Sequence, residues 1–177
     1  MQLNQNIFRA NDIRGIAYED LTEEVVQSLG RALGSEAIDR NIQKFIIGRD
    51  GRLSSPEIFD WLSSGIMSTG CNVIDIGIVT SPMFYHSTYE LNSSSGVVIT
   101  GSHNPGNYNG FKIVFNNHST SSEEILNLKQ RILEENFREG KGASKKEDIK
   151  ESYINRILES INPVSYTHLT LPTKRIV

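Results

Sequence analysis

A polar loop at residues 101–109 holds the side chains best suited to chemistry. Its sequence, GSHNPGNYN, combines Ser102, His103 and Asn104 with glycine and proline. Such a composition by itself indicates only that the chain turns. The loop follows a short apolar run at 96–100, however, which is typical of a buried strand. Because open α/β sheets bind ligands beyond the carboxyl ends of their strands, we expect Ser102 to lie at the mouth of a crevice.

The adjacent serine and histidine could suggest a hydrolase. In an extended segment, neighbouring side chains point to opposite sides, so we expect Ser102 and His103 to be a poor nucleophile and base pair. The nucleophile elbow G-x-S-x-G is absent, since Asn104 stands two residues after the serine. The sequence contains no Walker loop and no G-x-G-x-x-G fingerprint, which disfavours nucleotide- and dinucleotide-dependent enzymes.

Helices are expected on both sides of this loop. Helical spacing of apolar residues, caps and prolines predict them at 21–40, 56–69, 82–91, 121–137 and 152–161. Thr22 and Ser55 are the expected N-caps of the first two, and Ser121 with Glu124 forms a capping box for the fourth. The lysine-rich stretch 141–146 is expected to be a solvated loop.

Strands alternate with these helices. Short apolar runs bounded by turn residues predict strands at 44–48, 72–79, 96–100 and 110–115. This order predicts a three-layer α/β/α fold. The sheet should be mixed and mainly parallel, because the short link between the last two strands favours an antiparallel pair. We expect one domain over residues 1–162.

Composition excludes several classes of protein. The chain has 177 residues and a net charge of −3, so it lacks the basic surface of a nucleic-acid-binding protein. It has neither a secretory signal nor an apolar stretch that could span a membrane, and we expect a cytoplasmic protein without a membrane partner. Cys71 is the only cysteine, so an intramolecular disulfide is impossible, and we expect it to be a small core residue.

Three sequence blocks resemble, in order and spacing, the first domain of the phosphomannomutase/phosphoglucomutase type of α-D-phosphohexomutase. They are FRANDIRG at 8–15, GRDGRLS at 48–54, and TGSHNP at 100–105 followed by YNGFK at 108–112. The resemblance extends over residues 7–161. Together the three blocks are highly specific, more so than the serine block alone.

The resemblance implies a reaction for Ser102. As a phosphoserine it would donate its phosphoryl group to a hexose phosphate, and the resulting hexose bisphosphate would reorient and return its other phosphate. The net reaction interconverts hexose 1-phosphate and hexose 6-phosphate. The resemblance also implies Mg²⁺, bound through the serine phosphate and through an aspartate-rich loop of a second domain. That loop does not occur in this sequence.

Phosphoryl transfer requires that the reacting groups are positioned and that the negative charge on the phosphate oxygens is neutralised. The resemblance implies two cationic residues for this role. Arg14, expected in the loop before the first helix, and Lys112, expected on the strand after the serine loop, match residues that line the site. A guanidinium hardly deprotonates, so Arg14 is better suited to stabilising charge than to moving protons. Lys112 could do either if desolvation lowers its pKa.

Other matched residues have two possible roles. His103 and Asn104 could bind phosphate or support the loop. Asn11 stands where relatives commonly have tyrosine, which leaves its contacts with the sugar open. Arg49 could be a second basic contact, or it could form with Asp50 and Arg52 a self-paired loop that braces the serine loop.

The end of the sequence fits none of the expected elements. Residues 163–177 lack the turn that a second domain would begin with, and we expect a poorly packed, non-native tail. The chain would then be the serine-bearing domain alone, inactive as a mutase without the missing domains of the same polypeptide. Two alternatives remain. One is a phosphoglucosamine mutase, disfavoured by residues 8–11, and the other is a non-catalytic binding or regulatory module of the same fold.

Overall fold

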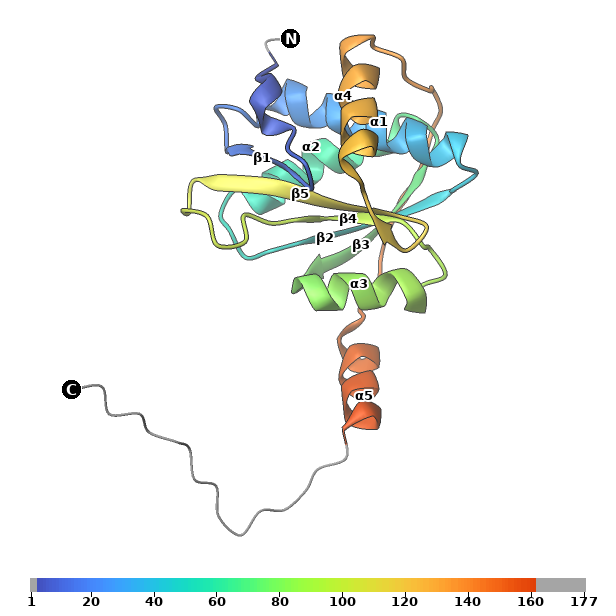
Figure 1. Ribbon diagram of the computed structural model, residues 1–177. Helices are drawn as coiled ribbons and strands as arrows, with labels where there is room; N and C mark the ends of the chain where they lie inside the picture. Colours follow the sequence, from blue (N-terminus) through green and yellow to red (C-terminus); the bar gives the residue numbers. More distant parts are fainter. Residues whose placement is uncertain (1–2, 162–177) are drawn as a thin grey trace, which may run out of the picture.

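A seven-stranded sheet forms the middle layer of the molecule (Figure 1). The computed structural model describes residues 3–161. The strands are β1 (Ile13–Ile16), β2 (Lys44–Arg49), β3 (Asn72–Ile78), β4 (Gly96–Ile99), β5 (Tyr108–Phe115), β6 (His118–Ser119) and β7 (Ser144–Lys146). Their order across the sheet is β1-β5-β4-β2-β3-β7, and β6 pairs with β5.

Helices cover both faces of this sheet. They are α1 (Glu23–Asp39), α2 (Ser55–Met67), α3 (Ser81–Glu90), α4 (Ser122–Leu133) and α5 (Lys150–Ser160), and a short 3-10 helix, η1 (Gln5–Ile7), precedes β1. In Figure 1, α1, α2 and α4 lie on one face, whereas α3 lies on the other with α5 beyond it. The three-layer α/β/α prediction is therefore confirmed.

The direction of the strands changes next to the serine loop. β4, β2, β3 and β7 are parallel neighbours, whereas β5 runs antiparallel to both β4 and β1. Among the described strands, β5 is thus the one that opposes the rest. The predicted mixed sheet is confirmed, and the loop between β4 and β5 emerges at the carboxyl end of a buried strand.

Apolar side chains fill both spaces between sheet and helices. The larger cluster, on the side of α1, α2 and α4, includes the fully buried Phe45, Leu62 and Phe111. Burial of one such side chain contributes roughly 1.5–3 kcal/mol. Helices α1 and α2 pack closely at Gly30 and Gly65, where an added Cβ would lie 2.4 Å and 2.3 Å from backbone oxygens of the opposite helix. This packing holds α2 against α1, while hydrogen bonds of Ser54 and Ser55 hold the amino-terminal end of α2 near the serine loop.

Three strands, β1, β6 and β7, were not expected. β6 has only two residues, both exposed, so no apolar pattern marks it. β1 includes Arg14, although the sequence predicts a loop there. Four residues with a glycine among them give no clear strand signal. β7 forms within the lysine-rich stretch expected to be loop, where Val73 N donates to Ala143 O at 2.9 Å. All three β7 side chains are exposed, so no apolar pattern marks it, and edge strands commonly carry lysine.

Helix boundaries agree with the predictions at some ends and differ at others. Thr22 and the capping box of Ser121 with Glu124 are confirmed as N-caps. Ser55 is not an N-cap: Ser54 occupies that position, and the Ser55 hydroxyl instead donates to Asp50 at 2.7 Å. Helix α4 ends at Leu133, before the expected residue 137.

The predicted tail at 163–177 lies outside the described residues. Within residues 3–161, none of the helices has the length and apolar character needed to cross a lipid bilayer. Cys71 is fully buried in the larger apolar cluster, as expected, and burial raises the pKa of its thiol to about 12.

Candidate functional site

Ser102 lies in the exposed loop between β4 and β5 and has an unusual backbone conformation. Its φ angle is +52°, in the left-handed region that costs a residue with a side chain roughly 1–2 kcal/mol. The Ser102 amide donates to the Thr100 hydroxyl at 3.0 Å, which supports this turn. The side chain itself is exposed, so the hydroxyl is accessible to a substrate.

The left-handed turn corrects one expectation about the serine and its neighbour. In an extended segment Ser102 and His103 would point apart, but the backbone at Ser102 is not extended. In the structure, Ser102 Oγ and His103 Nδ1 are 3.4 Å apart, which is long for a hydrogen bond. Within residues 3–161, no carboxylate orients the His103 ring, so the pair lacks the third member of a hydrolase triad.

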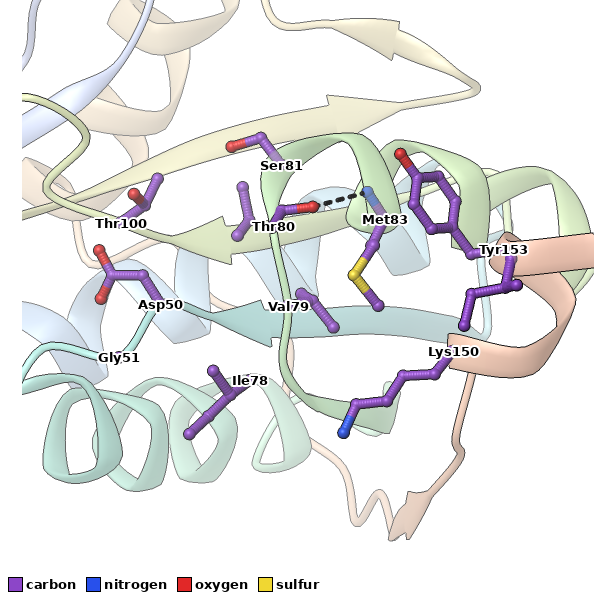
Figure 2. A pocket seen from close by; sticks show the side chains of 12 residues that line it. Asp50, Gly51, Ile78, Val79, Thr80, Ser81, Met83, Thr100, Lys150 and Tyr153 are labelled. Carbon is purple, nitrogen blue, oxygen red and sulfur yellow. Dashed lines mark hydrogen bonds between the residues drawn. The ribbon is translucent and has the colours of Figure 1, made fainter. Parts of the chain in front are cut away.

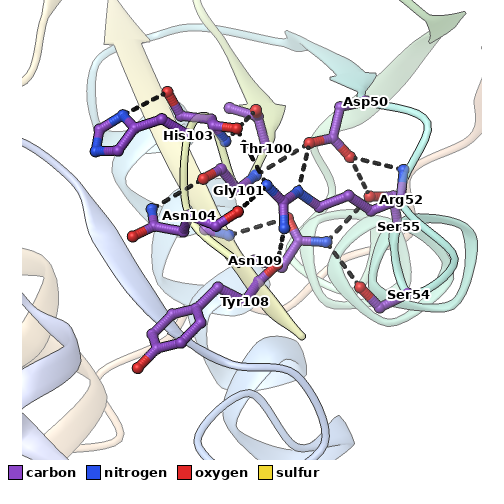
Figure 3. Close-up of polar contacts among 12 residues, drawn as sticks. Asp50, Arg52, Ser54, Ser55, Thr100, Gly101, His103, Asn104, Tyr108 and Asn109 are labelled. Carbon is purple, nitrogen blue, oxygen red and sulfur yellow. Dashed lines mark hydrogen bonds and ion pairs between the residues drawn. The ribbon is translucent and has the colours of Figure 1, made fainter. Parts of the chain in front are cut away.

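The serine loop rests on a network of polar side chains from the segment after β2 (Figure 3). Asp50 accepts from the Gly101 amide at 3.0 Å and from the Ser55 hydroxyl at 2.7 Å. Arg52 donates to backbone carbonyls of the loop. On the β5 side, the buried Asn109 donates to the hydroxyls of both Ser54 and Ser55 at 3.0 Å.

The environment of Asp50 keeps its carboxyl group ionised. Burial alone would raise its pKa, but hydrogen bonds from the Ser55 hydroxyl, the backbone amides of Arg52 and Gly101 and the Thr100 hydroxyl outweigh burial. The pKa of Asp50 is therefore held below its ordinary value. The carboxylate connects the segment after β2 to the first residue of the serine loop.

Arg14 and Lys112 lie on the same face of the sheet. Arg14 on β1 pairs with Gly110 on β5, two residues before Lys112, so both side chains point to the α3 face. Arg14 forms an ion pair with Asp12 and is 17% exposed. Within the described part of the chain, no carboxylate pairs with the half-buried Lys112. The structure therefore brings two cations to the base of the serine loop.

Of the other predicted residues, one lies within the serine loop and one lies before β1. Asn104 supports the loop, because its side-chain amide donates to Gly101 O at 2.9 Å. Asn11 is exposed in the tight turn that leads into β1.

Arg49 points away from the serine loop. It pairs with Asp75 on β3 at 2.9 Å and lies over the Phe59 ring, with 4.7 Å between its Cζ and the ring centroid. The structure therefore brings Arg52, and not Arg49, to the serine loop.

A cleft of about 630 Å³ adjoins this network on the α3 side (Figure 2). Asp50 and Thr100 line one end, and Lys150 and Tyr153 of α5 line the other. The start of α3 at Thr80, with its hydroxyl capping the helix, forms part of the wall. Sequence reasoning predicted a crevice at the carboxyl end of this strand but not the residues that line it, because the lining comes from four separate segments.

Comparison with known proteins agrees with this architecture. Residues 5–139 match the family described as phosphoglucomutase/phosphomannomutase, alpha/beta/alpha domain I. A phosphomannomutase/phosphoglucomutase of Pseudomonas aeruginosa is 42% identical over 159 residues, which cover 90% of this chain and 34% of the relative. A phosphoglucomutase of Neisseria gonorrhoeae is 36% identical over 158 residues, covering 88% of this chain and 34% of the relative.

A solved structure shows the same relation. A phosphoglucomutase/phosphomannomutase family protein of Burkholderia thailandensis superimposes with a TM-score of 0.86 at 36% identity, covering 90% of this chain and 37% of that protein. The chain therefore spans about a third of the length of the curated relatives it matches. On the match over residues 5–139, the chain belongs to the phosphoglucomutase/phosphomannomutase family, as its α/β/α domain I.

Proposed function

We propose that this domain carries the phosphoserine of a phosphohexomutase that interconverts hexose 1-phosphate and hexose 6-phosphate. The observation that carries the proposal is the exposed hydroxyl of Ser102, held in a strained turn beyond the carboxyl end of β4. A strained, well-supported residue in a loop of this kind is typical of a functional site. Membership of the mutase family supports the same reaction.

The proposed reaction has two phosphoryl transfers. In the first, the bond between phosphorus and Ser102 Oγ breaks as a free hydroxyl of the hexose phosphate forms a new bond to phosphorus. The sugar hydroxyl gives up its proton to a neighbouring group, and the released serine oxygen takes up a proton to become a hydroxyl. The sugar becomes a bisphosphate. After it reorients, its other phosphoryl group returns to Ser102 Oγ, so atoms and charges balance over the cycle and the serine is phosphorylated again.

Arg14 and Lys112 are suited to the charge that this chemistry creates. A phosphoserine has about −1.5 to −2 charge at pH 7, and the substrate brings a second phosphate. We assign Arg14 to charge stabilisation, because a guanidinium stays protonated. Lys112, which has no carboxylate partner within residues 3–161, can donate to a phosphate oxygen or exchange a proton with the sugar hydroxyl.

The remaining predicted residues have supporting roles in this proposal. His103 Nδ1, 3.4 Å from the serine oxygen, can donate to the serine phosphate. Asn104 maintains the turn through Gly101 O. Asn11 is exposed before β1 and can contact the sugar.

The described residues do not by themselves form a Mg²⁺ site. Within residues 3–161 there is no cluster of three histidine, cysteine or acidic side chains that could hold a metal ion. Asp12 is paired with Arg14, and Asp50 with Arg52 and Ser55. A phosphorylated Ser102 would add phosphate oxygens that could bind such an ion. We therefore assign no step of the reaction to a metal.

About two thirds of the length of the relatives lies outside the part that this chain matches. We propose that substrate recognition and turnover need that additional part, that the full-length protein works in the cytoplasm, and that the domain alone does not turn over hexose phosphates.

The full-length protein tests this proposal. We expect mass spectrometry to find a phosphate on Ser102, and we expect Ser102→Ala to abolish turnover of glucose, mannose and glucosamine phosphates. Ser119→Ala, at an exposed serine of β6, should retain both the phosphate and the activity. Undiminished turnover in the Ser102→Ala protein would refute the proposal, and an unmodified serine without turnover would favour a binding module.

A further inference from the structure

A single guanidinium occupies the inside of the serine loop (Figure 3). The Arg52 side chain is 15% exposed, although it lies beside a surface loop. Its nitrogen atoms donate to Asp50 Oδ2 at 3.2 Å and to the carbonyl oxygens of Pro105 at 2.5 Å, Tyr108 at 3.0 Å, Ser102 at 3.1 Å and Asn104 at 2.8 Å. An arginine has five N–H donors, so all of them are used.

The backbone beneath Arg52 is shaped to receive it. A Cβ added to Gly101 would lie 2.2 Å from Arg52 Cζ and 2.3 Å from its Nε. The guanidinium therefore packs directly against the backbone of the residue before the serine. Any side chain at position 101 would displace Arg52 from the loop.

The bonds from Arg52 account for the persistence of the strained turn. A left-handed non-glycine residue persists only where its surroundings over-determine the conformation. Ser102 is held on its carbonyl side by Arg52 and on its amide side by Thr100. Removal of Arg52 would leave four inward-facing carbonyls without this donor, and the loop could relax to an unstrained backbone.

We propose that Arg52 is a positioning residue for Ser102, which holds the serine loop in its reactive conformation and makes no contact with the substrate. This inference rests on the proposed function, and it deepens the loop-bracing alternative considered for the arginine group. Arg14 and Lys112 differ from Arg52 because they are not engaged with the carbonyls of this loop. A misplacement of about 1 Å in a reacting group can cost on the order of a hundredfold in rate.

The first test measures the loop in this chain. The amides of Gly101, Asn104 and Tyr108 are hydrogen-bonded and serve as reporters in hydrogen exchange. We expect Arg52→Lys to speed their exchange about tenfold or more, because lysine has three donors in place of the planar fork of five. Amides of β2 and α1 should be unchanged. Arg138→Lys is the matched control, since Arg138 pairs with Asp39 on α1.

A second variant disrupts the contact between Arg52 and Gly101 by changing Gly101. Gly101→Ala keeps Arg52 in the sequence but displaces its guanidinium, so the same reporter amides should lose protection. Circular dichroism confirms that each variant is folded. Unchanged protection of the three reporters in folded Arg52→Lys and Gly101→Ala chains would overturn the proposal.

The final test uses the full-length protein and separates positioning from substrate binding. We expect Arg52→Lys to lower kcat about tenfold or more while KM for the hexose phosphate changes less than about threefold. A raised KM with unchanged kcat would mean that Arg52 binds substrate, which overturns the proposal. If the unmodified full-length protein turned over no hexose phosphate, the proposed function would fail. The exchange results would still show whether Arg52 holds the serine loop.

Discussion

Arg14 on β1 and Lys112 on β5 are diagonal neighbours on one face of the sheet, because Arg14 pairs with Gly110, two residues before Lys112. Diagonal neighbours on adjacent strands have Cα atoms roughly 7–8 Å apart, within the combined reach of two long side chains. Arg14 has Asp12 as its partner, whereas Lys112 has no carboxylate partner within residues 3–161. The two cations therefore differ in what they can offer a phosphate.

Loss of Lys112 should lower activity strongly. In the full-length protein, we expect Lys112→Ala to reduce kcat by about a hundredfold or more, the usual cost of removing one preorganised electrostatic group. Steady-state kinetics with glucose 1-phosphate measures the effect. Lys141→Ala, at an exposed lysine before β7, is the control and should change kcat little. Equal activity of the two variants would contradict the role of Lys112.

At most positions an alanine variant is more stable than a glycine variant, and we expect the reverse at Ser102. Glycine adopts the left-handed region without the steric cost that alanine has, so Ser102→Gly should be more stable than Ser102→Ala by about 1 kcal/mol. Urea unfolding of this chain measures the difference. At Ser119, where no positive φ occurs, alanine should be the more stable of the two. Equal stability at position 102 would argue against the left-handed turn.

Asp50 should make stability depend on pH in the acid range. Its folded pKa lies below the unfolded value of about 3.9, so the unfolded chain binds the proton more readily. The stabilisation is complete above the unfolded pKa and is lost as the pH falls through the folded pKa. We expect wild type to exceed Asp50→Asn by about 1–3 kcal/mol at pH 7, with the gap narrowing below about pH 4. A gap that stays constant between pH 6 and pH 3 in urea unfolding would refute this.

Cys71 should be unreactive in the folded chain. Its side chain is fully buried, and burial raises the pKa of the thiol to about 12, so little thiolate forms at pH 8. A thiol reagent such as iodoacetamide should therefore label Cys71 only after urea unfolds the protein. Rapid labelling without denaturant would show that the α1 and α2 side of the core opens readily.

The regular elements were predictable where burial leaves a local pattern. The run 44–48 and the cap at Thr22 predicted β2 and the start of α1, because both signals lie within a few residues. β7 has three exposed side chains and forms only because β3 offers it an edge, so no local pattern could mark it.

The support of the serine loop depended on contacts distant in sequence. Arg49 and Arg52 belong to one motif, yet Arg49 pairs with Asp75 and Arg52 enters a loop about fifty residues further along the chain. Strand β2 ends at Arg49 and the chain turns before Arg52, so the two side chains diverge. The motif could identify the group of residues, but not which arginine holds Ser102.

The inward direction of the loop carbonyls also determines what the loop presents to solvent. A trans peptide unit holds its N–H opposite its C=O, and the described chain has no cis peptide bond. Because the carbonyls of Ser102 and Pro105 point toward Arg52, the amides of His103 and Gly106 point outward. Such oriented amides attract anions through fixed partial charges. The main chain alone thus gives the solvent-facing side of the serine loop a partial positive charge that does not depend on pH.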